Sequence, residues 1–175
     1  RREVLYDDKR WELLSSLRSK CLTLMETLRA RSIGAIVHGS IARGDVSMRS
    51  DVDVFIPSMT QPYMVELALR EIGVEAQERC IVQATPFYAV KGYIEIDGRT
   101  TVSFPLSKFS NTELDFYKFG GCLTLEGLKE NLRVPGVSKK LMLIEPTAEG
   151  HIETCVVGRE DYVAKRLNVS SAIVK

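Results

Sequence analysis

The chain has 175 residues, enough for one domain with its own hydrophobic core and a small appendage. Hydrophobic residues make up 45% of it and charged residues 27%, which is the composition of a soluble globular protein, and no apolar run is long enough to span a membrane. The net charge is only +1, so any contact with nucleic acid would need a local basic patch. These features predict a cytoplasmic protein with no membrane contact.

The cysteines are spread along the chain without a Cys-x-x-Cys pair or a histidine at ligand spacing. This spacing argues against a zinc site and gives no disulfide framework. We therefore expect buried, reduced thiols at Cys21, Cys80, Cys122 and Cys155.

Residues 3–30 carry apolar side chains at intervals of three and four residues, with Arg, Lys and Glu between them. This periodicity predicts an amphipathic helix whose apolar stripe packs on the core. The stripe consists of Leu13, Leu14, Leu17, Cys21, Leu24, Met25 and Leu28.

The most informative stretch runs from residue 33 to residue 56. It begins as a short apolar strand at 33–37, breaks at Gly39-Ser40, and returns to a strand in which Asp51 and Asp53 alternate with apolar residues. Because residues i and i+2 of a strand face the same side, the two carboxylates project together. Such a pair of hard oxygen ligands suits Mg²⁺, which leaves its other positions to water and substrate phosphate.

The Gly-Ser turn has the features of a phosphate site. Gly39 lets backbone N–H groups approach an anion, Ser40 offers a hydroxyl donor, and Arg43 offers a positive charge. With the acidic strand, these residues predict a site for a metal-bound triphosphate. We expect the two strands to lie side by side as parallel neighbours joined by a short helical turn, with both Asp side chains facing an open cleft.

These motifs resemble the signature of the DNA polymerase beta-like nucleotidyltransferase superfamily. Gly39-Ser40 is followed after ten residues by Asp51-Val52-Asp53, and Arg43-Gly44-Asp45 and Ser50 fit the version found in small nucleotidyltransferases. The close similarity covers about twenty residues, and a looser one extends to roughly residue 106. The alternative interpretation is an exposed edge strand with two solvated Asp side chains.

The resemblance implies an α/β fold, with a mixed β-sheet flanked by helices, and an enzyme that moves NMP from an NTP to a hydroxyl with release of pyrophosphate. Asp51 and Asp53 would hold Mg²⁺ or Mn²⁺ in a two-metal mechanism. Gly39, Ser40 and Arg43 would bind the triphosphate. The preferred base and the acceptor stay open, and nucleic acid, protein and small molecules are all candidate acceptors.

The resemblance also implies a third acid on a neighbouring strand, which helps to hold the metal and takes the proton of the attacking hydroxyl. In archaeal CCA-adding enzymes, a segment similar to residues 84–88 leads through a hairpin to an Asp shortly before a Pro, but residues 101–105 contain no acid. Glu95 is the candidate instead, because it alternates with Ile94 and Ile96 on the paired strand. The alternative is that Glu95 is a surface residue and that the enzyme is slow or inactive.

The remaining segments alternate between helix and strand signals. Asp97-Gly98 between two apolar runs predicts a β-hairpin, with Asp97 used by the turn. Ser110 and Glu113 have the spacing of a capping box, which opens a helix that ends near residue 131 and has a potential break at 120–121. The other predicted elements are a helix over 61–72 and strands over 80–84, 87–96, 100–104, 140–144 and 152–157.

The C-terminal segment resembles the first part of a helix-turn-helix. A helix-like pattern at 162–167 is followed by a turn at 168–170, and such a motif places its second helix in the major groove of DNA. Lys165, Arg166 and Lys175 would then contact phosphates. A plain pair of packing helices is the equally open alternative.

These segments predict a nucleotidyltransferase domain at residues 1–158 and the start of a helix-turn-helix at 159–175. Because the chain begins with Arg1 and ends at Lys175 within a helix-like pattern, we expect it to be a fragment of a longer protein.

Two functions remain open from the sequence. One is the metal-dependent nucleotidyltransferase; the other is a catalytically degenerate regulator that senses nucleotide and binds nucleic acid through the C-terminal segment. The paired acids favour the enzyme, whereas the missing third Asp and the C-terminal segment favour the regulator.

Overall fold

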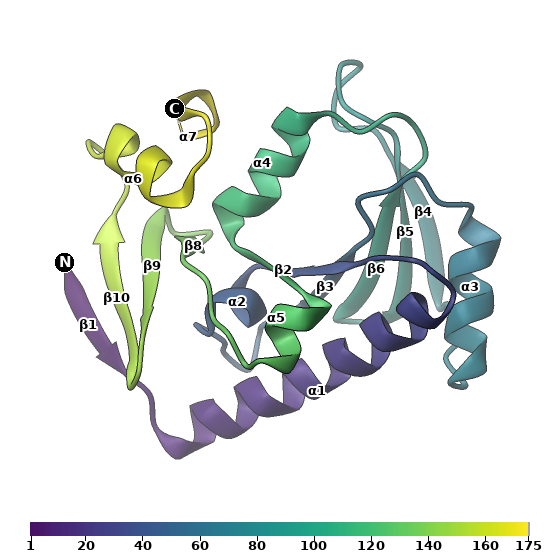
Figure 1. The fold of residues 1–175 in the computed structure, drawn as a ribbon, viewed down its shortest axis with the longest axis horizontal. Helices are drawn as coiled ribbons and strands as arrows, with labels where there is room; N and C mark the ends of the chain where they lie inside the picture. Colours follow the sequence, from purple (N-terminus) through teal and green to yellow (C-terminus); the bar gives the residue numbers. More distant parts are fainter. Residues whose placement is uncertain (175) are drawn as a thin grey trace.

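The computed structural model describes residues 1–174, in which two β-sheets are linked by helices (Figure 1). The six-stranded sheet has the order β4 (Glu78–Val82), β5 (Lys91–Asp97), β6 (Thr100–Pro105), β3 (Val52–Phe55), β2 (Ile36–His38), β7 (Cys122–Thr124). The four-stranded sheet has the order β1 (Arg2–Leu5), β10 (Gly150–Cys155), β9 (Met142–Thr147), β8 (Gly136–Val137). The predicted α/β architecture, with a mixed sheet flanked by helices, is confirmed.

One face of the six-stranded sheet forms the main core with α1 (Asp8–Ala30) and α3 (Pro62–Glu71). The apolar stripe of α1 packs there as its periodicity predicts, and α1 runs along the lower edge of the molecule in Figure 1 until it ends beside α3. Val52 and Val54 of β3 point into this core and are almost completely buried. Alternation along β3 therefore turns the residues between them to the opposite face.

The first strand corrects the predicted start of the N-terminal helix. Residues 2–5 form β1 and pair with β10, and the helix begins only after Asp7, whose carboxylate accepts a hydrogen bond from the Arg10 backbone N–H. Asp7 is thus an N-cap that separates strand from helix. The pairing partner of β1 lies about 150 positions away, so periodicity within the segment could not reveal this strand.

The predicted parallel pairing of the Gly-Ser strand with the acidic strand is wrong, because β2 and β3 are antiparallel neighbours. Their connection consists of the single turn of α2 (Ser40–Arg43) and a loop at 44–51. A parallel neighbour requires a crossover that carries the chain back along the sheet before the next strand starts. This connection instead turns the chain round at the same end, and the two strands still lie side by side.

The other segment predictions are confirmed with local differences. The hairpin forms between β5 and β6, and the capping box of Ser110 and Glu113 opens α4 (Asn111–Gly120). The predicted break at 120–121 is real and separates α4 from β7 and α5 (Leu125–Lys129). Free thiols are found at all four cysteines, but Cys80 and Cys155 are exposed on their strands rather than buried.

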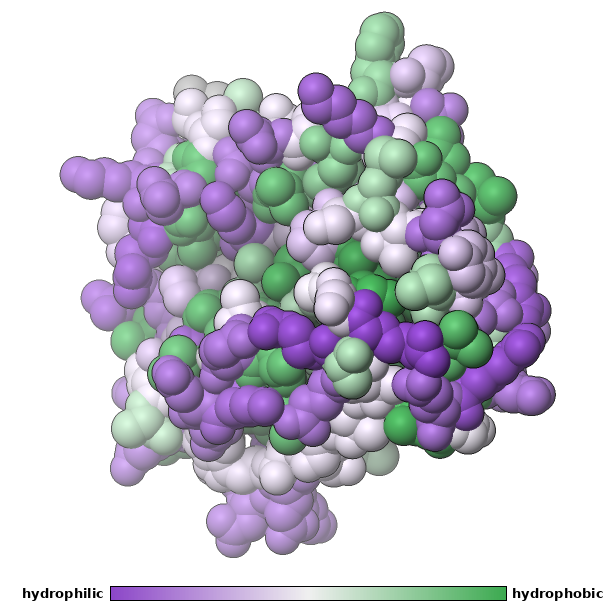
Figure 2. Space-filling view, turned by 45° about the vertical axis from the view of Figure 1, so that its right-hand side comes forward, coloured by the Kyte–Doolittle hydropathy of each residue, from purple (hydrophilic) through white to green (hydrophobic). Residues whose placement is uncertain are grey.

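The outer strand β4 is exposed at all five of its residues. Figure 2 turns this side of the molecule forward and shows hydrophilic side chains around most of the face, with apolar ones gathered near its middle and upper right. The loop between β4 and β5 projects from the top of the molecule in both views and carries Phe87, which is 97% exposed. No described residue therefore packs over the solvent side of β4.

The C-terminal segment forms α6 (Glu160–Leu167) and α7 (Ser171–Val174), separated by a turn at Asn168 in the left-handed conformation. Val163 of α6 joins a second, smaller core with the four-stranded sheet. The guanidinium of Arg166 binds Glu145 at 2.7 Å, and Lys175 lies outside the described residues. The helix-turn-helix remains a prediction.

No helix among residues 1–174 combines the length and apolar character needed to cross a bilayer.

Candidate active site

The two acids of the signature lie on the solvent face of the six-stranded sheet. Asp53 is in the middle of β3 and Asp51 directly precedes it, so both project away from the buried Val52 and Val54. Both line a cleft of about 860 Å³. Partial desolvation and the negative charge of Asp51 raise the pKa of Asp53 above its usual range. The predicted same-face arrangement of the two carboxylates is confirmed.

The Gly-Ser turn borders the same cleft. Gly39 has a φ of +84°, a left-handed conformation that favours glycine, and its N–H donates to the carbonyl of Gly121. The Ser40 hydroxyl lies 3.2 Å from that of Ser50, which accepts the backbone N–H of Ser47. The fold therefore holds Ser40 and Ser50 together at the end of the cleft next to Asp51.

Arg43 has a different position from that expected of a triphosphate ligand. Its side chain is buried, and Nε and Nη2 donate to the two carboxylate oxygens of Asp45 at 2.9 and 3.0 Å. Nη1 donates to the carbonyls of Gly120 and Val137. Because Val137 belongs to β8, Arg43 joins the Gly-Ser segment to the four-stranded sheet, and most of its donors are already engaged.

Basic side chains share the lining of the cleft with the acids Asp45, Asp51, Asp53 and Glu153. Lys139, in the turn between β8 and β9, places its Nζ 3.8 Å from Oδ2 of Asp51 while its side chain stays 97% exposed. The other basic residues that line the cleft are Arg1, Arg2, Arg10, Arg43, Arg49 and Lys140. Lys139 was not among the predicted site residues, although the adjacent pair Lys139-Lys140 in a short turn was a usable signal.

His38 was also missed and is the direct neighbour of Asp53 across β2 and β3. Burial first, and then the positive charges of Arg43, Lys139 and Lys91, lower the pKa of His38 to about 4. Its Nε2 faces Gly120, where a Cβ would approach it to 2.3 Å. At neutral pH the imidazole is therefore uncharged and adds no positive charge to the cleft.

The third acid does not join the pair in the described part of the chain, where no group of three or more acidic, Cys or His side chains is placed to hold a metal. The strand pairing explains this. Thr101 of β6 lies directly opposite Asp53, and Glu95 of β5 lies opposite Thr101. Glu95 thus shares the face of the Asp pair but is two strands, or about 10 Å, from Asp53.

The Asp51 and Asp53 carboxylates fit a divalent metal. They are hard oxygen donors on one exposed face, and a cation between them would offset the partial burial and the negative charge of Asp51 that together raise the pKa of Asp53. Lys139 already places a positive charge beside Asp51. These two carboxylates are therefore the residues that could hold Mg²⁺ or Mn²⁺.

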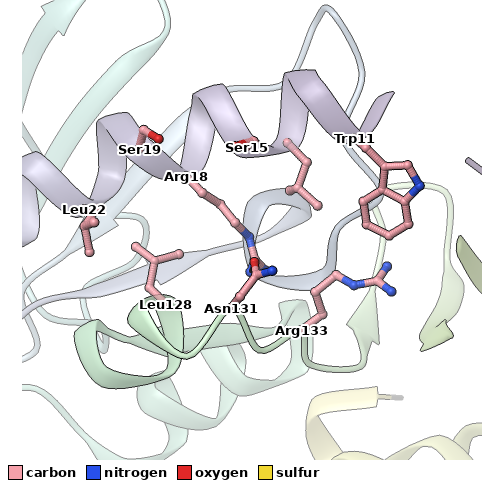
Figure 3. Close-up of a pocket in the computed structure, with 9 residues that line it drawn as sticks. Trp11, Ser15, Arg18, Ser19, Leu22, Leu128, Asn131 and Arg133 are labelled. Atoms are coloured by element: carbon pink, nitrogen blue, oxygen red, sulfur yellow. Dashed lines mark hydrogen bonds between the residues drawn. The ribbon is translucent and has the colours of Figure 1, made fainter. Parts of the chain in front are cut away.

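A second hollow, of about 250 Å³, lies between α1 and the segment that follows α5 (Figure 3). Arg18 extends across it from α1 toward Asn131. Its guanidinium donates to the carbonyls of Ile41, Ala42 and Leu132 and to the side-chain oxygen of Asn131. Arg18 therefore has a structural role behind the Gly-Ser turn, because its buried guanidinium is already bonded to protein oxygens.

Comparison with known families agrees with this geometry. Residues 18–99 match the family described as "Nucleotidyltransferase domain", a segment that includes both Asp51 and Asp53 and ends in the β5–β6 turn. A search of curated proteins gave no match. Residues 18–99 therefore match a nucleotidyltransferase domain, in agreement with the resemblance to the DNA polymerase beta-like superfamily, and the match supports a general function in the transfer of a nucleoside monophosphate.

Proposed function

We propose that this protein is a metal-dependent nucleotidyltransferase that moves NMP from an NTP to a hydroxyl acceptor and releases pyrophosphate. One observation carries the proposal: the Asp51 and Asp53 carboxylates and the Gly-Ser turn line one cleft together with several Arg and Lys side chains. Carboxylates for a metal and cations for a triphosphate are the two requirements of this chemistry.

Within this proposal, Asp51 and Asp53 hold Mg²⁺ or Mn²⁺, which when bound would offset negative charge on the phosphates. Ser40 contacts the triphosphate through its backbone N–H and hydroxyl, and Gly39, which has no side chain, lets the phosphates approach the turn. Lys139, whose exposed side chain lies beside Asp51, would contact the phosphates. Arg43 acts indirectly, because its bonds to Asp45, Gly120 and Val137 fix the Gly-Ser turn against the four-stranded sheet.

The transfer forms one bond and breaks one. The acceptor oxygen bonds to the α-phosphorus, the bond from the α-phosphorus to the bridging oxygen breaks, and pyrophosphate leaves with that electron pair. The proton of the acceptor hydroxyl passes through a water to Glu95, which shares the sheet face of Asp53 but lies about 10 Å from it. An acceptor placed over Thr101 would lie between Asp53 and Glu95, since the three residues form one row across the sheet.

Glu95→Gln tests this assignment. The amide keeps the size of the side chain but cannot accept the proton, so we expect pyrophosphate release to fall roughly 100-fold or more while MgATP binds with unchanged affinity. Release is measured with each NTP and Mg²⁺, and binding by calorimetry. Glu75→Gln, at an exposed position before β4, is the matched control and should retain full activity.

Equal rates for Glu95→Gln and the wild type would remove Glu95 from the mechanism. Tight MgATP binding by a wild type that releases no pyrophosphate with any NTP would instead support the alternative of a nucleotide-sensing regulator.

Lys139→Ala should weaken MgATP binding roughly tenfold, because the variant lacks one charge-assisted contact to the triphosphate. The loss should shrink as salt concentration rises, since the side chain is exposed. Lys108→Ala, which removes an exposed lysine outside the cleft lining, is the control. Unchanged affinity of Lys139→Ala at low salt would exclude Lys139 from the triphosphate site.

A further inference from the structure

We propose that the four-stranded sheet binds the base of the NTP, and that the Glu153 carboxylate and the Arg2 guanidinium select guanine. This inference rests on the proposed nucleotidyl transfer and extends it to the identity of the nucleotide. All four strands of this sheet lie outside residues 18–99, so the family match does not describe them.

The cleft beside Asp51 and Asp53 continues onto the four-stranded sheet, whose strand β9 lies beside α2 (Figure 1). Its volume of about 860 Å³ is within the range of sites that enclose a whole drug-sized ligand, so an NTP fits with its base. Among the described residues, the lining includes none from β4, β5 or β6. From β1, β9 and β10 it includes Arg2, Met142, Ile144, His151, Glu153 and Cys155. The space left for the nucleoside of an NTP bound at Ser40 and Asp53 is therefore the part along this sheet.

The sheet side of the cleft combines apolar and charged side chains. Ile144 is the direct cross-strand neighbour of Glu153, and Met142 is that of Cys155. Glu153 is in turn the direct neighbour of Arg2 on β1. Direct neighbours on adjacent strands face the same side, so Ile144, Glu153 and Arg2 form one row across the sheet. An apolar side chain beside an ion pair suits a flat ring that carries polar groups along one edge.

Two partners hold the Glu153 carboxylate in place. Nε of Arg2 donates to Oε2 at 3.1 Å, and Nε2 of His151 lies 3.3 Å from Oε1. The pKa of Glu153 is lowered, because these contacts outweigh the effect of burial, which raises it. Glu153 is therefore ionised at neutral pH and acts as an acceptor of hydrogen bonds.

Tyr6 fixes the orientation of His151. Its hydroxyl lies 2.6 Å from Nδ1 of the imidazole. Burial is the largest cause that raises the pKa of Tyr6 to about 12 and lowers the pKa of His151, so both are uncharged at neutral pH. A neutral imidazole has one N–H, which must lie on Nε2 to donate to the ionised Glu153, and Tyr6 then donates to Nδ1. This chain of hydrogen bonds positions the carboxylate before any nucleotide binds.

The remaining hydrogen-bonding capacity matches guanine. A carboxylate has about four acceptor sites, and each Glu153 oxygen takes one hydrogen bond from Arg2 or His151, so sites remain on both oxygens. A guanidinium has five N–H groups, of which Arg2 uses one for this hydrogen bond. Guanine presents two adjacent donors, N1–H and N2–H, next to the acceptor O6. Adenine, cytosine and uracil each present an acceptor beside a donor there, which the carboxylate would repel.

Three nucleotides that differ in the base test the inference by calorimetry, without requiring turnover. ITP lacks the amino group of GTP but keeps N1–H and O6, and ATP lacks the whole pattern. We expect MgGTP to bind roughly tenfold more tightly than MgITP, the effect of one lost hydrogen bond to a charged group. MgATP should bind more weakly than MgITP.

Glu153→Gln should reduce the preference for MgGTP over MgATP roughly tenfold, because the amide has only one acceptor oxygen. The ratio of affinities is the measure, since loss of a negative charge from the cleft would strengthen binding of every triphosphate. Arg2→Met should reduce the same ratio roughly threefold, and it changes a side chain that is 73% exposed, where loss of the fold is not expected.

Glu145→Gln is the matched control. Glu145 lies on the same sheet next to Ile144, binds Arg166 and is not part of the cleft lining, so its substitution should leave the ratio unchanged.

Equal affinities of the wild type for the three nucleotides, or an unchanged ratio in both Glu153→Gln and Arg2→Met, would overturn the inference and leave the proposed nucleotidyl transfer intact. Failure of every NTP to bind in the presence of Mg²⁺ would overturn both, so the two failures are distinguishable.

Discussion

Asp53→Asn should abolish Mg²⁺-dependent binding of ATP, with a loss of about 100-fold or more in affinity, and Asp51→Asn should do the same. The amide keeps the volume of the side chain but removes the charge on which affinity for a hard cation depends. Calorimetry with ATP in the presence and absence of Mg²⁺ measures the effect. Binding of MgATP at wild-type affinity by both variants would exclude a metal site at this pair.

The stability of Asp53→Asn separates loss of the site from loss of the fold. The pKa of Asp53 is raised in the folded protein, which means that folding disfavours its charged form at neutral pH. The uncharged amide should therefore leave the free energy of unfolding unchanged or slightly increased. Asp7→Asn is the matched control, because Asn caps a helix about as well as Asp does, and it should change neither property.

Arg43→Met should destabilise the protein by about 3–5 kcal/mol, the range for breaking a buried ion pair by removing one partner. The variant leaves the Asp45 carboxylate almost buried without its guanidinium and removes the donors to the carbonyls of Gly120 and Val137. Arg43→Lys should rescue only part of the loss, because an ammonium cannot form the two-pronged contact with Asp45. Unfolding in urea measures the change.

Arg49→Met is the control for this experiment, since Arg49 lines the same cleft from an exposed position. Its effect on the free energy of unfolding should stay within about 0.5 kcal/mol. A similarly small effect for Arg43→Met would show that the contact between the two sheets does not depend on this guanidinium. If Arg43→Met instead lost much of its MgATP affinity at unchanged stability, Arg43 would be a direct ligand of the triphosphate.

The sequence by itself determined the features that depend on neighbouring residues. The two-residue period of a strand places Asp51 and Asp53 on one face, whichever strands lie beside them. The break at Gly39-Ser40, the Asp97-Gly98 turn and the capping box at Ser110 are likewise local, because each depends on backbone conformations that a few adjacent residues prefer. These elements were predictable from local sequence, and the mixed α/β fold was predictable from the resemblance that the Gly-Ser and Asp-Val-Asp motifs carry.

Features that depend on contacts between distant segments were decided only by the tertiary structure. The antiparallel direction of β3, the strand at residues 2–5 and the burial of Arg43 all arise from partners far away in the chain. The same holds for Lys139, which reaches Asp51 from the other sheet. The row of Asp53, Thr101 and Glu95 follows from the register of β3, β6 and β5, and register is a property of paired strands that no single strand encodes.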